Sequence, residues 1–230
     1  MTIRRGRRLL PWVATVTVVG GFFALSGQSY AAVTVVTGSA YGYYSNVSLF
    51  GGPFVPKGPA PRVTLPPGGS TSGVTANAPS ETAQYGPAVI FSSGSETVTT
   101  KGTPAGGSVT SSTSILNAGG SPFTASKVTS TCTAKPTAVT GSTAITSGKL
   151  VTKTDANGNP VTTVSIPAKP ARNTTYTGTV NNVGDSFRFV FNEQVVHPDG
   201  SVTVNAGHEY LLGPTAKGDL IFGQSVCGVR

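Results

Sequence analysis

Strong helix-forming residues are scarce in most of this chain, and that shortage constrains the fold more than any other feature. Residues 32–230 contain only four Glu and seven Leu, whereas Thr, Val, Ser and Gly are abundant. β-Branched side chains fit the pleated surface of a sheet, and Gly and Pro mark the turns between strands. No stretch shows a convincing helical period. The sequence therefore predicts an all-β protein.

Short alternating segments between Gly- and Pro-containing turns favour a single antiparallel β-sandwich or jelly-roll-like domain over residues 32–230. A β-solenoid is the alternative, which the absence of an internal repeat disfavours. Asn157-Gly158 predicts one hairpin and His197-Pro198-Asp199-Gly200 a second. The expected strands include 32–37, 39–50, 88–92, 96–101, 108–116, 125–134, 138–145, 209–212 and 219–226. In the second hairpin, Phe187, Phe189 and Phe191 are expected to face the core.

Two polar stretches near the start of the domain predict less regular structure. Residues 51–69 form a Pro/Gly-rich segment, which we expect to run extended or as polyproline outside the central sheet. It could be a strap across the sheet or a linker. Residues 70–86 stay polar, and we expect them to form a long loop.

Residues 1–31 have the three-part plan of a secretory signal peptide, with an N-terminal helix expected in the apolar run. Four arginines precede an apolar run over residues 9–25, and Ser29 and Ala31 suit signal peptidase at positions −3 and −1. We predict cleavage after Ala31 and a secreted, extracellular product with no stable membrane anchor. The sequence leaves open whether export follows the general or the twin-arginine route.

The charge of the predicted mature domain is modest. Residues 32–230 retain twelve of the sixteen Lys and Arg and all eight Asp and Glu, a net charge of +4. The basic residues are scattered singly and form no stripe. We therefore expect no nucleic-acid binding.

The two cysteines predict a disulfide. Cys132 lies in a segment where Val128, Ser130, Cys132 and Ala134 alternate with more polar residues, which places it on the inward face of a strand. Cys227 follows another expected strand. An exported chain favours a Cys132–Cys227 bridge over two buried thiols. A metal site is not expected because no His accompanies them.

Candidate chemical motifs are incomplete. Gly184-Asp185-Ser186-Phe187 resembles an esterase block, but no Asp stands three residues before His197 or His208. The pair His208-Glu209 lacks the second His of a zinc protease motif. Asp155, Asn157 and Asn159 match only half of a calcium loop. We expect no catalytic residue, cofactor or metal site.

Three stretches together resemble a known family: GSAYGYYSNVSLFGGPFVPKGPAPRVTLPPGG, VTSTCTAKPTAVTGSTAI and GSVTVNAGHEYLLGPTAKGDLIFGQSVCG. The chain resembles the secreted actinobacterial proteins grouped as the choice-of-anchor P family. The resemblance implies an exported β domain of unknown role, joined in different members to different anchors. This chain shows no evident anchor. The contexts of Cys132 and Cys227 look like the family's paired cysteines, and the pattern implies no catalytic residues.

These observations predict a secreted, non-enzymatic structural or interaction protein of the bacterial cell exterior. Its expected partner is a component of the cell envelope or the extracellular medium, and its oligomeric state stays open. The first alternative is a carbohydrate-binding module that uses Tyr41, Tyr43 and Tyr44 as a platform, although residues 32–230 contain no Trp. The second is a hydrolase that uses Ser186 or an acid pair assembled in space.

Overall fold

Every element in the described part of the chain is a β-strand, which confirms the all-β prediction. The computed structural model describes residues 32–120 and 122–230, so the predicted signal peptide and its cleavage site lie outside it. No helix able to cross a membrane occurs within these two ranges. The strands are β1 (Val36–Leu49), β2 (Val55–Thr64), β3 (Ser70–Ala78), β4 (Thr82–Tyr85), β5 (Ala88–Ser92), β6 (Glu96–Thr103), β7 (Ser108–Gly119), β8 (Phe123–Lys135), β9 (Ala138–Thr146), β10 (Lys149–Thr154), β11 (Pro160–Ser165), β12 (Thr174–Val180), β13 (Asp185–Val196), β14 (Val202–Leu212) and β15 (Ala216–Val229).

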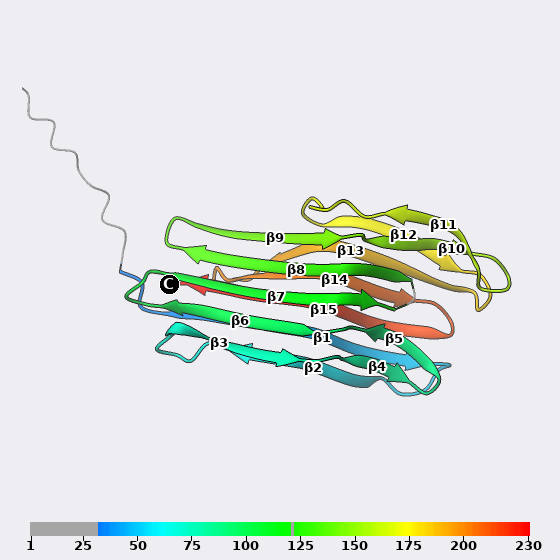
Figure 1. Cartoon of the computed structure of the whole chain (residues 1–230), viewed down its shortest axis with the longest axis horizontal. Helices are drawn as coiled ribbons and strands as arrows, with labels where there is room; N and C mark the ends of the chain where they lie inside the picture. The colour runs from blue at the N-terminus through cyan, green and yellow to red at the C-terminus, as the bar shows by residue number, and fades with distance from the viewer. Residues whose placement is uncertain (1–31, 121) are drawn as a thin grey trace, which may run out of the picture. The chain divides into compact units, whose positions relative to one another are not determined.

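The strands belong to one 15-stranded sheet that folds over itself into a nearly closed, barrel-like sandwich (Figure 1). One layer runs β2-β1-β15-β14-β13-β12, and the other contains β3, β6, β7, β8 and β9. The strand β10 pairs with both β12 and β8, so it joins the layers. The first and last strands pair along their length, from Val36↔Val229 to Leu49↔Ala216. This pairing places the first and last strands of the domain side by side in one layer.

Five long strands share a shift in their inward-facing alternation. Successive inward-facing side chains along a strand normally lie two residues apart, but here one pair on each strand lies three apart, and Gly42, Gly207 and Gly223 lie within three of these intervals. These pairs are Ala40 and Tyr43 on β1, Ile115 and Ala118 on β7, Ala125 and Val128 on β8, Ala206 and Glu209 on β14, and Phe222 and Ser225 on β15. At the shift on β15, Gly223 has a φ of 65°, a backbone conformation that is strained for residues with a side chain. Because neighbouring strands shift together, the pairing register is kept.

The shift separates two differently packed parts of the interior. On one side lies an aromatic core that contains Phe123, Phe187, Phe189, Phe191 and Phe222, each at most 5% exposed. The predicted inward orientation of the three alternating phenylalanines of β13 is thus confirmed. Stacked and tilted ring pairs with centroids 4.5–5.8 Å apart fill the space between the layers.

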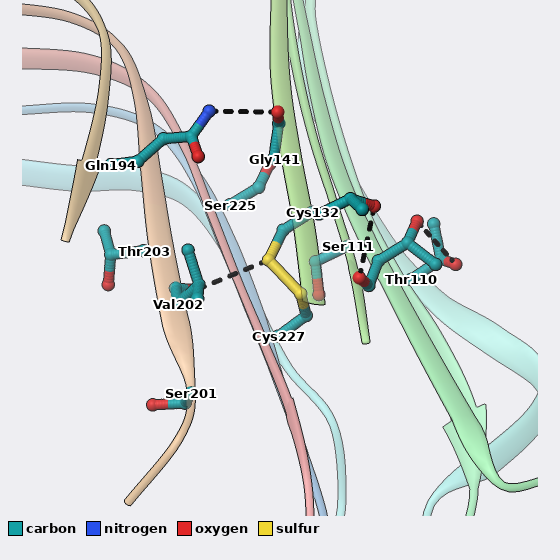
Figure 2. Close-up of a disulfide and its surroundings, with 12 residues drawn as sticks. Thr110, Ser111, Cys132, Gly141, Gln194, Ser201, Val202, Thr203, Ser225 and Cys227 are labelled. Carbon is teal, nitrogen blue, oxygen red and sulfur yellow. Dashed lines mark hydrogen bonds between the residues drawn. A yellow bond between two sulfur atoms is a disulfide. The ribbon is translucent and has the colours of Figure 1, made fainter. Parts of the chain in front are cut away.

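On the other side, small side chains and the disulfide join the layers. The predicted Cys132–Cys227 bridge is present and links β8 to β15, with a Cα–Cα distance of 5.6 Å (Figure 2). Ser130 and Ser225 are hydrogen-bonded across the same gap at 2.7 Å. Gln194 Nε2 on β13 donates to the Gly141 carbonyl on β9 at 2.9 Å, as Figure 2 shows. The predicted inward face of Val128, Ser130, Cys132 and Ala134 is fully buried.

Several predicted boundaries are wrong. Residues 32–37 and 39–50 do not form two strands, because β15 pairs continuously along a single β1. Residues 70–86 form β3 and β4 rather than a loop, and these strands bury Ala78, Ala83 and Tyr85 against the core. The Pro/Gly-rich segment 51–69 supplies β2, whose ladder partner is β1. That edge position tolerates its prolines.

Two further strands differ from the prediction. Residues 209–212 are not a separate strand but the end of β14, which runs unbroken from Val202 to Leu212. The strand β12 was not predicted, and its side chains alternate between exposed and half-buried. The solenoid alternative is wrong because hairpin-linked strands pair antiparallel throughout, apart from the single parallel bridge between β10 and β12.

Candidate functional site

Five side chains from five adjacent strands form one continuous line across the outer surface of the sheet. Backbone pairing places Arg62 on β2 opposite Tyr41 on β1, then Gln224 on β15, Asn205 on β14 and Glu193 on β13. Tyr41 and Gln224 alternate with the buried Ala40 and Ser225, so they point away from the core. We call these five residues the outer-face row.

Hydrogen bonds connect most of the outer-face row. Gln224 Nε2 donates to Tyr41 Oη at 2.8 Å and to Asn205 Oδ1 at 2.9 Å. Asn205 Nδ2 donates to Glu193 Oε2 at 2.7 Å. The amides are therefore fixed in one orientation, because each donates toward a defined acceptor. Arg62 is exposed at the end of the row.

A second group on the same face converges on Glu193. His208 Nδ1 lies 2.7 Å from Glu193 Oε2, and Tyr210 Oη donates to Glu193 Oε1 at 2.7 Å. His208 Nε2 lies 3.2 Å from Asp219 Oδ1. The Tyr210 ring stacks on His208 with centroids 3.8 Å apart, and Arg188 Cζ lies 4.0 Å from the centre of the Tyr210 ring. Aromatic and cation–π contacts thus reinforce the hydrogen bonds.

The network sets the charges of its members. Burial would raise the pKa of Glu193, but hydrogen bonds from His208, Tyr210 and Asn205 outweigh it and lower the pKa to about 2. Burial, followed by the bond to the Glu193 carboxylate, raises the pKa of Tyr210 to about 12. Burial is also the main cause of the raised pKa of Tyr41. At neutral pH Glu193 is therefore a carboxylate held by neutral tyrosine and amide donors.

Both histidines of the described chain already contact polar side chains. Both ring nitrogens of His208 face carboxylates, so a substrate would have to displace one of them to reach the imidazole. His197, the other histidine, has Nε2 2.8 Å from Thr203 Oγ1. Ser186, the serine of the esterase-like block, lies at the start of β13. It takes no part in the hydrogen bonds that His197 and His208 make here.

The predicted tyrosine platform is not assembled as expected. Tyr43 is 5% exposed and stacks on Phe91 in the aromatic core at 5.1 Å, whereas Tyr41 and Tyr44 lie on the outer face. The cause is the shift at Gly42, which reverses the alternation between residues 41 and 43. The interpretation of Tyr41 and Tyr43 as sharing one face is therefore wrong.

The half calcium loop is a hairpin turn. Asp155 Oδ1 accepts from the backbone N–H groups of Asn157 and Asn159, each at 2.8 Å, and Asp155 Oδ2 accepts from Asn159 Nδ2 at 3.1 Å. The turn itself thus uses both carboxylate oxygens, and the predicted hairpin is confirmed. Within residues 32–120 and 122–230 there is no cluster of three or more His, Cys, Asp or Glu suited to hold a metal ion.

Local sequence reasoning missed the outer-face row because its members are far apart in the chain. Tyr41 and Gln224, which share a hydrogen bond, are separated by 183 positions. The group around Glu193 has one local signal, the i, i+2 pair His208 and Tyr210, which would share a face of a strand. Comparisons of the chain with protein-family models, curated proteins and solved structures found no match.

Proposed function

We propose that the protein is exported and acts outside the cell as a non-enzymatic interaction protein, with the outer-face row as its contact surface. The partner is a component of the cell envelope or the extracellular medium. The disulfide supports the extracellular setting, since such bridges persist in oxidising compartments. The signal-peptide pattern and the resemblance to the choice-of-anchor P family favour the same setting.

The observation that carries the proposal is the hydrogen-bonded order of the outer-face row. Its amide and tyrosine groups are held by neighbours on a sheet closed by a disulfide, so a partner would not have to order them. Preorganisation of this kind lowers the entropy cost of binding. Tyr41 and Arg62 belong to the residue types that are enriched at protein interfaces.

Retention on envelope material tests this proposal. Purified protein is incubated with whole cells and isolated cell walls of the source bacterium, and the bound fraction is measured by sedimentation. We expect Tyr41→Ala and Arg62→Ala to reduce retention several-fold. Lys127→Ala, an exposed cation on β8 in the other layer, is the matched control and should bind as the unmodified protein does. Absence of retention on both fractions, or equal retention by all variants, would refute the proposal.

A carbohydrate partner is the second candidate, because Tyr41 and Tyr44 share the outer face. A glycan array with the unmodified protein and Tyr44→Ala tests it. Binding that Tyr44→Ala abolishes would identify a sugar as the partner, whereas a blank array would remove this candidate. Tyr43 is unsuitable for the test, because its substitution would damage the aromatic core.

A further inference from the structure

A cavity of about 230 Å³ lies away from the outer-face row, where the ends of β1, β12 and β14 meet the starts of β5, β13 and β15. We call it the end cavity. Most of its wall is apolar and includes Leu49, Ile90, Pro122, Val180, Phe187 and Leu211. Phe50 and Val183 also contribute to the wall and are exposed, so the cavity opens to solvent.

Glu209 contributes a carboxyl group to this apolar wall. The shift in alternation on β14 turns it inward, beside Phe189 and Leu220 on the neighbouring strands, and it is 2% exposed. Its Oε1 atom is buried and has no hydrogen-bond partner. A buried polar atom without a partner destabilises a fold, so it calls for an explanation.

The other acidic group of the end cavity is already satisfied. Asp185 accepts hydrogen bonds from the Thr215 backbone N–H at 2.8 Å and from the Thr215 hydroxyl, and so fixes the turn before β15. The wall formed by the described residues contains no basic side chain. A ligand that satisfies Glu209 must therefore bring its own hydrogen-bond donor, and two carboxyl groups favour a cationic one.

We propose that the end cavity binds a small hydrophobic primary amine, whose ammonium group donates to Glu209 while its apolar body contacts the wall. An engineered apolar cavity of about 150 Å³ holds benzene. The end cavity therefore has room for an aromatic ring with a short aminoalkyl arm. This site is separate from the outer-face row, and neither proposal depends on the other.

Binding would be coupled to the ionisation of Glu209. Burial raises the pKa of its carboxyl group to about 8, so the group is neutral near pH 7. When the ammonium enters, the carboxyl group releases its proton to solvent and an ion pair forms, with no covalent change. Asp185 is the other titratable group of the wall, and Ile90, Phe189, Leu220 and Phe222 surround Glu209 with apolar surface. Affinity should therefore rise with pH up to about 8 and then level off.

Calorimetry with phenethylamine tests the proposal on the full chain. Titrations at about pH 6.5, in two buffers with different ionisation enthalpies, give both the affinity and the number of protons released. We expect saturable one-to-one binding with about one proton released per amine. Glu209→Gln should weaken binding at least about tenfold, because the amide cannot form the ion pair. The uncharged analogue 2-phenylethanol should bind more weakly and release no proton.

Glu96→Gln is the matched control. Glu96 is also fully buried and its two carboxylate oxygens lack partners, but it is not part of the end-cavity wall. Its substitution should leave phenethylamine affinity within about twofold. Val180→Phe, which fills the cavity from β12, should abolish binding even if Glu209→Gln fails to fold. The proposal is overturned if phenethylamine shows no saturable binding, if no proton is released, or if Glu209→Gln or Val180→Phe binds as tightly as the unmodified protein.

Discussion

Removal of the disulfide should cost this domain a large part of its stability. Cys132 and Cys227 are separated by 95 positions, so the bridge closes nearly half of the domain into one loop. In the chain-entropy model, closing a loop of that length in the unfolded chain contributes about 4.7 kcal/mol. Typical domains have a free energy of unfolding of about 5–15 kcal/mol. We therefore expect Cys132→Ala/Cys227→Ala to lose a third or more of the total.

Urea unfolding of residues 32–230, followed by circular dichroism and tyrosine fluorescence, measures this loss. The control Thr131→Ala/Val226→Ala changes the outward-facing neighbours on the same two strands and leaves the loop closed. It should shift the free energy of unfolding by less than about 1 kcal/mol. A loss below about 1 kcal/mol in the cysteine double variant would refute the reasoning, because the two layers would then be held by packing alone.

Three further predictions concern buried carboxyl groups. Burial raises the pKa of Glu96 to about 7, so its contribution should make stability fall as pH rises from about 4.5 through about 7 and then level off, and urea midpoints of Glu96→Gln should fall less. The lowered pKa of Glu193 has the opposite sign: its stabilisation is present above about pH 4.5 and lost toward about pH 2, so acid unfolding should be shallower in Glu193→Gln. A methyl group at Gly42 would overlap Glu96 Oε2. Gly42→Ala should therefore lower the free energy of unfolding by about 1–3 kcal/mol, and an unchanged melting temperature would contradict this overlap.

Features that depend on local alternation and turn chemistry could be predicted from the sequence. The inward face around Cys132 and the phenylalanines of β13 follow a period of two, and Asn157-Gly158 allows the positive φ of a tight hairpin turn. The disulfide followed from the same pattern plus the inferred compartment. These features need only a few neighbouring residues to specify them.

Features that depend on the shared shift could not be predicted. Uninterrupted alternation from Val204 and Ala206 would bury the side chain of His208 in the core and expose Glu209, whereas the structure places His208 against Glu193 on the outer face and buries Glu209 in the core. The shift arises from several strands that deviate together, so no single strand reveals it. The outer-face row and the end cavity both depend on it, because it decides which polar residues face solvent and which face the core.

The proposed function depends on residues 32–230 reaching the cell exterior as an oxidised, processed domain. Intact mass measurement of the protein from culture supernatant and from the cell pellet, with and without reductant, tests this most directly. The account predicts a supernatant species that begins at Ala32 and gains two hydrogens on reduction. A full-length species confined to the pellet, with no mass change on reduction, would contradict it.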